Sequence, residues 1–479
     1  MNKRFILNIL KMCLSNFLQL FSGILVGFIV PKIMGYDDYA NFKIYTLYLT
    51  YLSLFTIGFG DGLYLKFAGI DKERLNKSEI SYLLRKYYLQ LFLFFIIILF
   101  LVLFFLPKEY FFIGICLCVS LISTNVVSVH QNLSLITSRF NEYSLRTVIK
   151  ALFTSIFVIF LYVLFKINAS KISYKIYLFG YISIEILLAI WYVVTYREFN
   201  FGKVKKEELT GLSYKSILYI GFPLLLSNMA GTIFLNLDRQ FVSILFDKTD
   251  YAIYAFAYNM LSLITTMTTA ISLVIFPSMK KIQNIDVKVH LEKYLTVFSV
   301  LVCFCLMVYF PLYYFIHFFL EKYINSLEIF AIVLPGIVLS STISVIFFNF
   351  YKLDNKVKLY LCITLSAIVI SIGLNFGAYF IFKNYCAISW ASIISISIWY
   401  VMVSIYFVRK YKLNIIKNSV FIVLSIVLFY ICVNYIDVVW LSGIIYMVAL
   451  CIIIFLLYYK IIISKIKKMQ IKANRYVKF

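Results

Sequence analysis

The sequence predicts an all-α integral membrane protein with about fourteen transmembrane helices, arranged as two parallel six-helix lobes plus two C-terminal helices. Three observations support this prediction. The 479 residues are 63% hydrophobic and only 14% charged, with a mean hydropathy of +0.94, far above that of soluble domains. Most Lys and Arg residues lie in every second connection between the predicted helices. An internal repeat relates the first six predicted helices to the next six.

The predicted helices are apolar runs bounded by charged and turn residues. Most runs approach 20 residues, enough to cross about 30 Å of hydrocarbon as helix. The first run continues past Pro31 at full spanning length, which disfavours a removable signal peptide. The predicted ranges are 5–33, 42–66, 83–106, 110–135, 147–166, 174–196, 217–246, 251–279, 292–316, 326–351, 358–382, 385–408, 417–435 and 439–463.

The formal charge of +24 could indicate a nucleic-acid partner, but the positive residues lie in the connections between apolar runs. Of the 45 Lys and Arg, 35 fall in every second connection or in the termini, nine fall in the other connections, and Arg239 lies within a helix. The positive-inside rule then places both termini in the cytoplasm. The basic tail from Lys460 to Lys478 fits attraction to anionic membrane lipids and needs no nucleic acid.

The repeat appears when the sequence is shifted by 212 residues. Leu14-Ser15-Asn16 then aligns with Leu226-Ser227-Asn228, and Asp38-Tyr39-Ala40 aligns with Asp250-Tyr251-Ala252 without a gap. Because each unit has an even number of helices, both copies have the same orientation in the membrane, as in transporters whose substrate site lies between two repeats. We expect an N-terminal lobe at 1–205, a second lobe at 206–410, and two extra helices with a basic tail at 411–479.

Polar residues inside predicted helices are the best candidates for a site, because a charge at mid-bilayer costs about 2.5–3.5 kcal/mol. The strongest group lies in the seventh helix, where Arg239 shares a face with Thr232 and Asn228, two and three turns earlier. The equivalent face of the first helix also carries polar residues. The candidate cavity residues are Asn16, Gln19, Asn228, Thr232, Asn236, Asp238, Arg239 and Gln240.

Two interpretations of Arg239 stay open. Its rigid fork of donors suits a diphosphate or an acidic sugar, with Asp238 orienting it. Alternatively, Asp238 and Arg239 form a structural pair near the outer interface. Asp61 and Glu185 are further carboxylates in predicted helices, and either could carry a coupling proton or sodium ion.

The sequence contains no residue set for catalysis or for a cofactor. Nothing matches a phosphate-binding loop, a catalytic triad or a zinc pattern. The two Cys-x-Cys pairs have no His or carboxylate nearby to complete a metal site. We therefore expect a protein that is not an enzyme and that has neither a metal nor another cofactor.

Two short patterns carry a family resemblance. The run from Val30 to Ala40, followed by Ile57-Gly58-Phe59-Gly60, resembles the first-hairpin signature of bacterial polysaccharide flippases. Gly221-Phe222-Pro223, Leu237-Asp238-Arg239, Asp250-Tyr251-Ala252 and Phe276-Pro277 resemble their second-lobe pattern. The match covers both lobes. The family is the polysaccharide branch of the multidrug, oligosaccharidyl-lipid and polysaccharide exporter superfamily.

The resemblance implies an inner-membrane flippase that moves an undecaprenyl-diphosphate-linked repeat unit to the periplasmic leaflet by alternating access, for O-antigen (lipopolysaccharide) or other surface polysaccharide. It implies a cationic cavity, for which Arg239 would be joined by Arg139, Arg146 and Lys150 near the inner mouth. It also implies a lipid-linked oligosaccharide substrate, coupling to protons or sodium, and contact with other membrane proteins of polysaccharide assembly.

Two alternatives from the same superfamily compete with this function. A multidrug or cation antiporter would use acidic groups in the first or seventh helix, yet the first helix has no carboxylate. A peptidoglycan-precursor flippase would share the fourteen helices. A glycosyltransferase or polymerase would need a large outer loop, and no outer connection is long enough to hold one.

Overall fold

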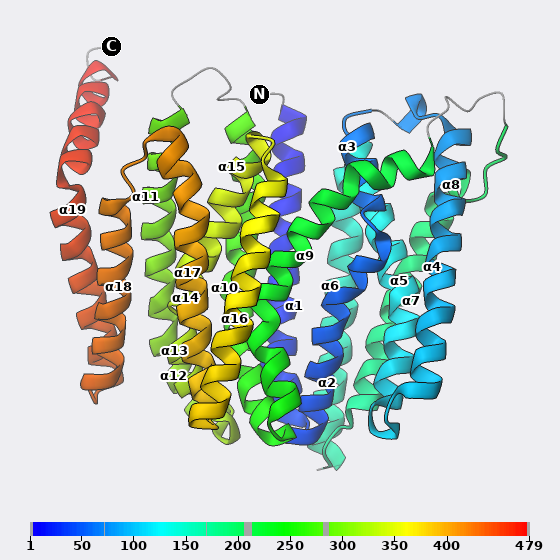
Figure 1. Cartoon of the computed structure of the whole chain (residues 1–479), viewed down its shortest axis with the longest axis horizontal. Coiled ribbons are helices and arrows are strands. Elements are labelled where there is room, and N and C mark those ends of the chain that lie inside the picture. Colours follow the sequence, from blue (N-terminus) through cyan, green and yellow to red (C-terminus); the bar gives the residue numbers. More distant parts are fainter. Residues whose placement is uncertain (1–2, 71, 169, 206–212, 281–286, 477–479) are drawn as a thin grey trace. The chain divides into compact units, whose positions relative to one another are not determined.

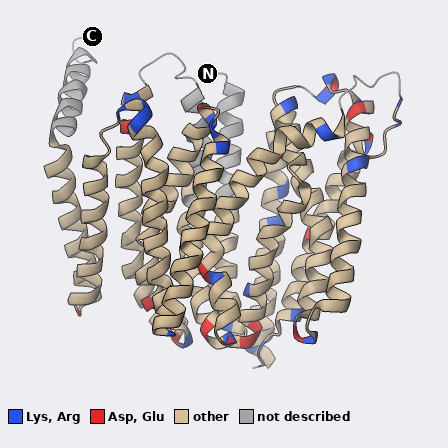
Figure 2. Ribbon diagram, viewed as in Figure 1, with Lys and Arg blue, Asp and Glu red and all other residues tan. Residues whose placement is uncertain are grey.

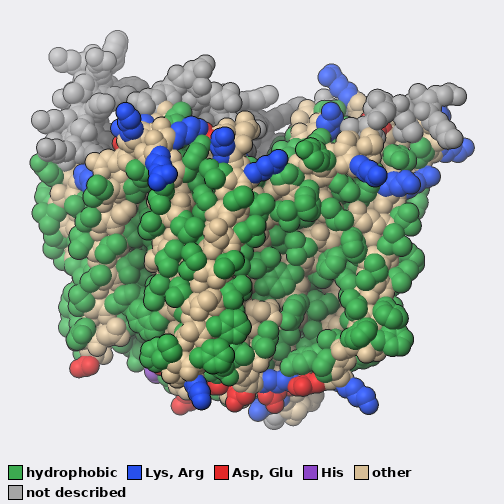
Figure 3. Space-filling model, in the orientation of Figure 1, with side chains coloured by type: hydrophobic (Ala, Val, Ile, Leu, Met, Phe, Trp, Pro, Cys, Tyr) green, Lys and Arg blue, Asp and Glu red, His purple; other side chains and the backbone are tan. Residues whose placement is uncertain are grey.

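The computed structural model describes residues 3–70, 72–168, 170–205, 213–280 and 287–476, and within these ranges every regular element is helical (Figure 1). Eleven of the described helices are long and apolar enough to cross a membrane. Charged residues gather at the helix ends (Figure 2), and hydrophobic side chains cover the surface between them (Figure 3). The prediction of an all-α, multi-pass membrane protein is confirmed.

The first six spans are formed by helices of the N-terminal part. The second span is broken into three pieces, and short helices lie in several connections. The bounds are α1 Lys3–Ile33, α2 Tyr36–Leu49, η1 Thr50–Thr56, α3 Phe59–Phe67, η2 Lys72–Arg74, α4 Lys77–Phe105, η3 Lys108–Tyr110, α5 Phe111–Ile136, α6 Phe140–Asn168, α7 Tyr174–Thr195 and α8 Arg197–Asn200.

The remaining helices complete the second set of six spans and add two more. The bounds are α9 Tyr214–Leu245, α10 Lys248–Lys280, α11 Val287–Cys305, η5 Leu306–Val308, α12 Tyr309–Phe319, η6 Glu321–Tyr323, α13 Ser326–Val333, α14 Gly336–Ser341, η7 Thr342–Phe347, α15 Phe348–Leu353, α16 Val357–Phe382, α17 Tyr385–Tyr411, α18 Ile416–Tyr435 and α19 Val439–Tyr476.

Each of the fourteen predicted ranges has a helical counterpart, and several helices begin earlier than predicted. α2 begins at Tyr36 rather than at 42, because Gly35 provides an extended N-cap and two acidic residues occupy the first turn. α4 begins at Lys77 rather than at 83, because the Asn76 side chain accepts a hydrogen bond from the Glu79 N–H. Capping residues and polar first turns thus extend helices beyond their apolar runs.

Helix bounds follow the 212-residue shift. Shifted by 212, α1 would cover 215–245 and the broken second span would cover 248–279; α9 occupies Tyr214–Leu245 and α10 occupies Lys248–Lys280. α4 would likewise cover 289–317, within the joint range of α11 and α12. The spans therefore recur in the same order and at nearly the same spacing in both copies.

Two compact units are distinguished by packing. One comprises Met1–Ala270 and Asp354–Ile388, in which α1 packs on α6, α5 on α7, and α9 on α3 and α16. The other comprises Ile271–Leu353 and Ser389–Phe479, in which α18 packs on α19 and α11. This division differs from the repeat, so the lobes at 1–205 and 206–410 stay a prediction. All sites discussed below lie within the first unit.

The break in the second span is held by side chains from neighbouring helices. Ile57 and Gly58 have positive φ values of 49° and 80°, which interrupts the helix between η1 and α3. Carbonyl groups released by the break still find donors: Asn125 Nδ2 donates to the Leu52 carbonyl at 3.0 Å, and Gln90 Nε2 donates to the Phe55 carbonyl at 2.7 Å. Polar side chains in α4 and α5 thus stabilise irregular backbone at membrane depth.

Glycines bring α3 and α9 into backbone contact near the end of the helices predicted to face the cytoplasm. A Cβ atom on Gly221 would lie under 3.0 Å from backbone atoms of Gly58 and Gly62, and one on Gly62 would lie equally close to the Ile217 carbonyl. Gly58 and Gly62 are four residues apart, the spacing by which small residues let membrane helices approach closely. The sequence motif around Asp61 therefore has a packing role.

Candidate functional site

A polar cluster lies about 10 Å below the helix ends predicted to face the periplasm. Arg239 is six residues before the end of α9, and Lys43 is seven residues after the start of α2, so both lie at a similar depth. α10 contributes an aromatic and an amide side chain to the same place. The outer cluster, as it is called below, consists of Lys43, Asn236, Asp238, Arg239, Gln240, Tyr258 and Asn259.

Asp238 is the anchor of the outer cluster. Its side chain is buried, and its carboxylate accepts hydrogen bonds from Tyr254 at 2.9 Å and from Tyr258. Its other oxygen accepts from the backbone N–H of Arg239 at 2.7 Å. A buried carboxylate with three donors is well satisfied, and it fixes α9 against α10.

The Arg239 guanidinium is held by neutral groups. It lies over the Tyr258 ring, 4.7 Å from the centroid, and donates to the Asn236 side chain. Its Nε is buried without a hydrogen-bond partner among the described residues, and no ion pair within that part of the chain involves Arg239. Both interpretations of Arg239 considered from the sequence stay predictions.

Lys43 is a second cation in the cluster, and sequence reasoning missed its role by counting it with the outer connections. Its ammonium donates to Asn259 Oδ1 at 2.8 Å and lies 5.3 Å from the ring centroids of Tyr39 and Phe42. α2, which carries Lys43, packs against α9, which carries Arg239. The signal that could have revealed it is the acidic first turn of α2, which places Lys43 two turns inside a helix.

Other predicted cavity residues lie along α9. Gln240 Nε2 donates to the Tyr48 hydroxyl of α2 at 2.7 Å, so it belongs to the outer cluster. Asn228 is exposed and Thr232, half-buried, donates to the Asn228 carbonyl at 3.0 Å. These two residues lie about 10–16 Å from Arg239 toward the other end of α9. Asn16 lies in α1, but its side chain is outside the described set.

A cavity of about 280 Å³ brings together three other predicted residues, Gln19 of α1, Lys150 of α6 and Glu185 of α7. Lys150 and Glu185 form an ion pair in which the Glu185 side chain is 3% exposed and that of Lys150 29% exposed. This first-half cavity also presents Gln131, Tyr143 and Tyr181. Its polar lining distinguishes it from an apolar packing defect.

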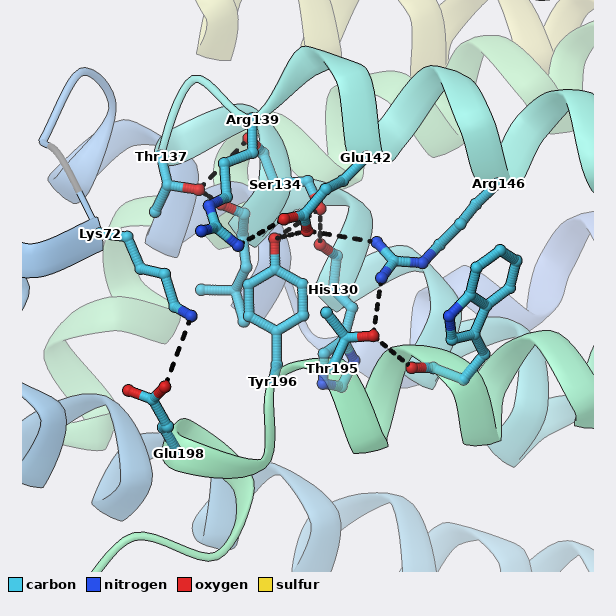
Figure 4. Close-up of polar contacts among 12 residues, drawn as sticks. Lys72, His130, Ser134, Thr137, Arg139, Glu142, Arg146, Thr195, Tyr196 and Glu198 are labelled. Carbon is cyan, nitrogen blue, oxygen red and sulfur yellow. Dashed lines mark hydrogen bonds and ion pairs between the residues drawn. The ribbon is translucent and has the colours of Figure 1, made fainter.

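The two predicted inner-mouth arginines are engaged in a network that joins the ends of α5, α6 and α7 (Figure 4). Arg139 pairs with Glu142, whose other oxygen faces Arg146 at 3.4 Å. Arg146 is buried, donates to Thr195 Oγ1 at 2.8 Å, and stacks 4.3 Å from the Tyr192 ring centroid. These contacts direct Arg146 into the helix packing, whereas Lys150, one turn later, lines the cavity.

We expect Arg146→Gln to destabilise the protein by about 2 kcal/mol or more, because it removes a desolvated cation–π contact. Arg146→Lys should restore little, since an ammonium cannot stack as a planar guanidinium does. Thermal unfolding in detergent measures the loss, and Arg197→Gln, at an exposed position nearby, is the control. Equal unfolding temperatures for Arg146→Gln and the unaltered protein would contradict this role.

No cofactor or metal site emerges from the described part of the chain, where no group of three or more His, Cys, Asp or Glu could hold a metal ion. Asp61, the other candidate coupling carboxylate, is half-buried in α3. Its role stays a prediction.

Comparison with known proteins identifies the family. Residues 6–283, more than half of the chain, match the family model described as "Polysaccharide biosynthesis protein". The chain belongs to this family. A search of curated proteins found no matching sequence.

Solved structures show the same fold. "Lipid II flippase MurJ, inward closed conformation" aligns with a TM-score of 0.66 at 16% identity, covering 95% of this chain and 100% of that one. An inward-facing multidrug resistance MATE family transporter of the MOP superfamily aligns with a TM-score of 0.52 at 10% identity, covering 83% and 94%. The outward-facing conformation of such a transporter gives 0.51 at 9% identity, covering 84% and 94%. The chain thus has the same fold as these structures.

Proposed function

We propose that the protein is a flippase that moves an undecaprenyl-diphosphate-linked oligosaccharide from the cytoplasmic to the periplasmic leaflet of a bacterial inner membrane. Both termini face the cytoplasm, and the repeat unit serves O-antigen or another surface polysaccharide. Family membership supports a role in polysaccharide biosynthesis. The fold supports transport by alternating access.

The observation that carries the proposal is the pair of cations in the outer cluster. Lys43 and Arg239 come from helices of different repeats, and each is held by neutral amides and aromatic rings within the described residues. A diphosphate esterified at both ends carries one negative charge per phosphate, so the two cations match it. Arg supplies a directional fork and Lys a point charge, a combination suited to adjacent phosphates.

The outer cluster can also couple binding to movement. Lys43 is bonded to Asn259 of α10, and Asn259 Nδ2 donates to the Gly27 carbonyl of α1 at 2.9 Å. Gln240 of α9 is bonded to Tyr48 of α2. These bonds join helices of the first repeat to helices of the second. An anion that draws Lys43 to itself would weaken the Lys43–Asn259 bond and favour separation of the helices on this side.

Deleting the gene tests the function in cells. We expect lipid-linked repeat units to accumulate on the cytoplasmic face and surface polysaccharide to fall, because translocation precedes assembly outside. The accumulation is measured as labelled sugar in extracted lipids. A sugar-modifying reagent that cannot cross the membrane, added to the outer face before extraction, distinguishes lipids of the outer leaflet from those still on the cytoplasmic face. Drug hypersensitivity without accumulation would instead favour the antiporter.

A peptidoglycan-precursor flippase is the second candidate. The lipid II flippase structure aligns along its own entire length with 95% of this chain. The match to the polysaccharide biosynthesis family favours the first candidate. Arrest of cell-wall synthesis after gene deletion, with surface polysaccharide unaffected, would favour the second.

The energy source belongs to the proposal as well. We propose that an ion gradient drives the cycle, with Asp61 as a carboxylate within the membrane that protons or sodium could reach. Contact with other membrane proteins of polysaccharide assembly would bring the lipid-linked substrate to the flippase and remove it afterwards.

A further inference from the structure

The first-half cavity combines the donor and acceptor groups that a sugar ring requires. Gln19 and Gln131 each offer an amide, with a carbonyl acceptor and two N–H donors. Tyr143 and Tyr181 add hydroxyl groups and flat ring faces. Sugar hydroxyls both donate and accept hydrogen bonds, and the axial C–H groups of a sugar ring form an apolar face. The lining provides counterparts to both features.

The size of the cavity limits its occupant. At about 280 Å³ it lies just below the range of about 300–1,000 Å³ typical of small-molecule pockets. It has room for a single sugar ring or a small disaccharide, and not for a complete lipid-linked repeat unit. It is bounded by α1, α5, α6 and α7, all within one compact unit.

The Lys150–Glu185 ion pair is difficult to explain by stability alone. Removing two charges from water costs several kcal/mol per ion, and well-packed apolar residues often replace such pairs without loss. The partly exposed Lys150 side chain faces the cavity, so the pair presents ammonium donors and a carboxylate acceptor to whatever enters. Tyr181, one turn before Glu185 on α7, adds a hydroxyl group to this polar wall.

The same pair argues against a metal-ion site at Glu185. The Lys150 ammonium already pairs with the Glu185 carboxylate and would compete with an added cation. Sites for hard cations gather six or more oxygen ligands, commonly from several carboxylates. Within the described residues, no cluster of acidic groups supplements Glu185.

We propose that the first-half cavity is a sugar subsite, in which Lys150 and Glu185 hydrogen-bond the hydroxyl or charged substituents of one sugar of the lipid-linked substrate. The inference rests on the proposed flippase function and adds the determinant of sugar specificity. Glu185 lies about 16 Å below the outer end of α7, deeper than the outer cluster. A sugar chain extending inward from a diphosphate at Lys43 and Arg239 would approach this depth.

Reconstituted vesicles test the subsite with two probes: the lipid-linked repeat unit purified from the source cells, and undecaprenyl diphosphate without sugar. We expect the unaltered protein to prefer the glycosylated probe. Lys150→Met and Glu185→Gln should each reduce this preference by about tenfold or more, because each removes a charged hydrogen-bonding partner. Transport of the sugar-free probe should be unchanged. Lys166→Gln, at an exposed position on the same helix, is the matched control.

The swapped variant K150E/E185K separates recognition from structure, because it keeps an ion pair while exchanging donor and acceptor. We expect a folded protein with the sugar preference still lost. Recovery of the preference in the swapped variant, or equal loss for both probes in the single variants, would overturn the sugar subsite. The sugar subsite would also be overturned if the single variants kept the sugar preference but their transport no longer depended on an imposed proton or sodium gradient. Failure of the unaltered protein to move either probe would instead refute the flippase function itself.

Discussion

Gly221→Ala is expected to damage the protein severely although it adds a single methyl group. The new Cβ would lie under 3.0 Å from the backbone of Gly58 and Gly62, and backbone atoms cannot yield as a flexible side chain can. Overpacking typically costs about 1–3 kcal/mol and occasionally more. Because α3 and α9 come from different repeats, forcing them apart should also impair closure on the cytoplasmic side.

Two measurements check the Gly221 prediction. Thermal unfolding in detergent should show a lower midpoint, and cysteine labelling near the inner ends of α3 and α9 should increase. Gly23→Ala is the matched control, since a Cβ there meets no atom within 4 Å. An unchanged unfolding midpoint together with unchanged labelling in Gly221→Ala would show that the two helices do not pack this closely.

Arg239→Gln and Lys43→Gln should each slow translocation of a diphosphate-linked substrate by about tenfold or more. A hydrogen bond to a charged group contributes roughly 1.5–3 kcal/mol, and 1.4 kcal/mol corresponds to a factor of ten. The double variant should lose less than the product of the two single effects, because both residues bind one anion. Arg239→Lys should recover part of the rate, since it keeps the charge without the planar fork.

The control for this pair is Lys248→Gln, which removes an outer-side cation that already pairs with Glu109. Its rate should match that of the unaltered protein. The measurement is the initial rate of lipid translocation at equal amounts of folded protein. Translocation at the unaltered rate in both single variants would contradict a diphosphate site at Lys43 and Arg239.

Much of the fold was accessible from the sequence because membrane insertion imposes simple rules. The lengths of the apolar runs predicted the number of spans. The concentration of Lys and Arg in every second connection predicted their orientation. The 212-residue shift anticipated the recurrence of α1 as α9. The break at Ile57 and Gly58 was less accessible, because its stability depends on donors from Gln90 and Asn125 in other helices.

The candidate sites were accessible only in part, because a helical pattern identifies a face but not its partner. Asp238 and Arg239 stood out as charges in an apolar helix, yet the neighbours that hold them, Tyr258 and Asn236, are uncharged. Lys43 was not recognised as a membrane residue because the predicted helix began at 42, whereas α2 begins at Tyr36. Lys150 and Glu185 were both named as candidates, but their pairing depends on how α6 packs against α7.

The most direct measurement of the central claim is leaflet exchange of a labelled undecaprenyl-diphosphate-linked oligosaccharide in vesicles that contain the purified protein. Sugar exposed on the outer leaflet is removed by an added glycosidase, so protection reports the inner leaflet. We expect rapid loss of protection with the unaltered protein and slow loss with Arg239→Gln. The contradicting result is protection equal to that in protein-free vesicles, obtained with a preparation that is active in exchanging organic cations for protons. The protein would then be an antiporter and not a flippase.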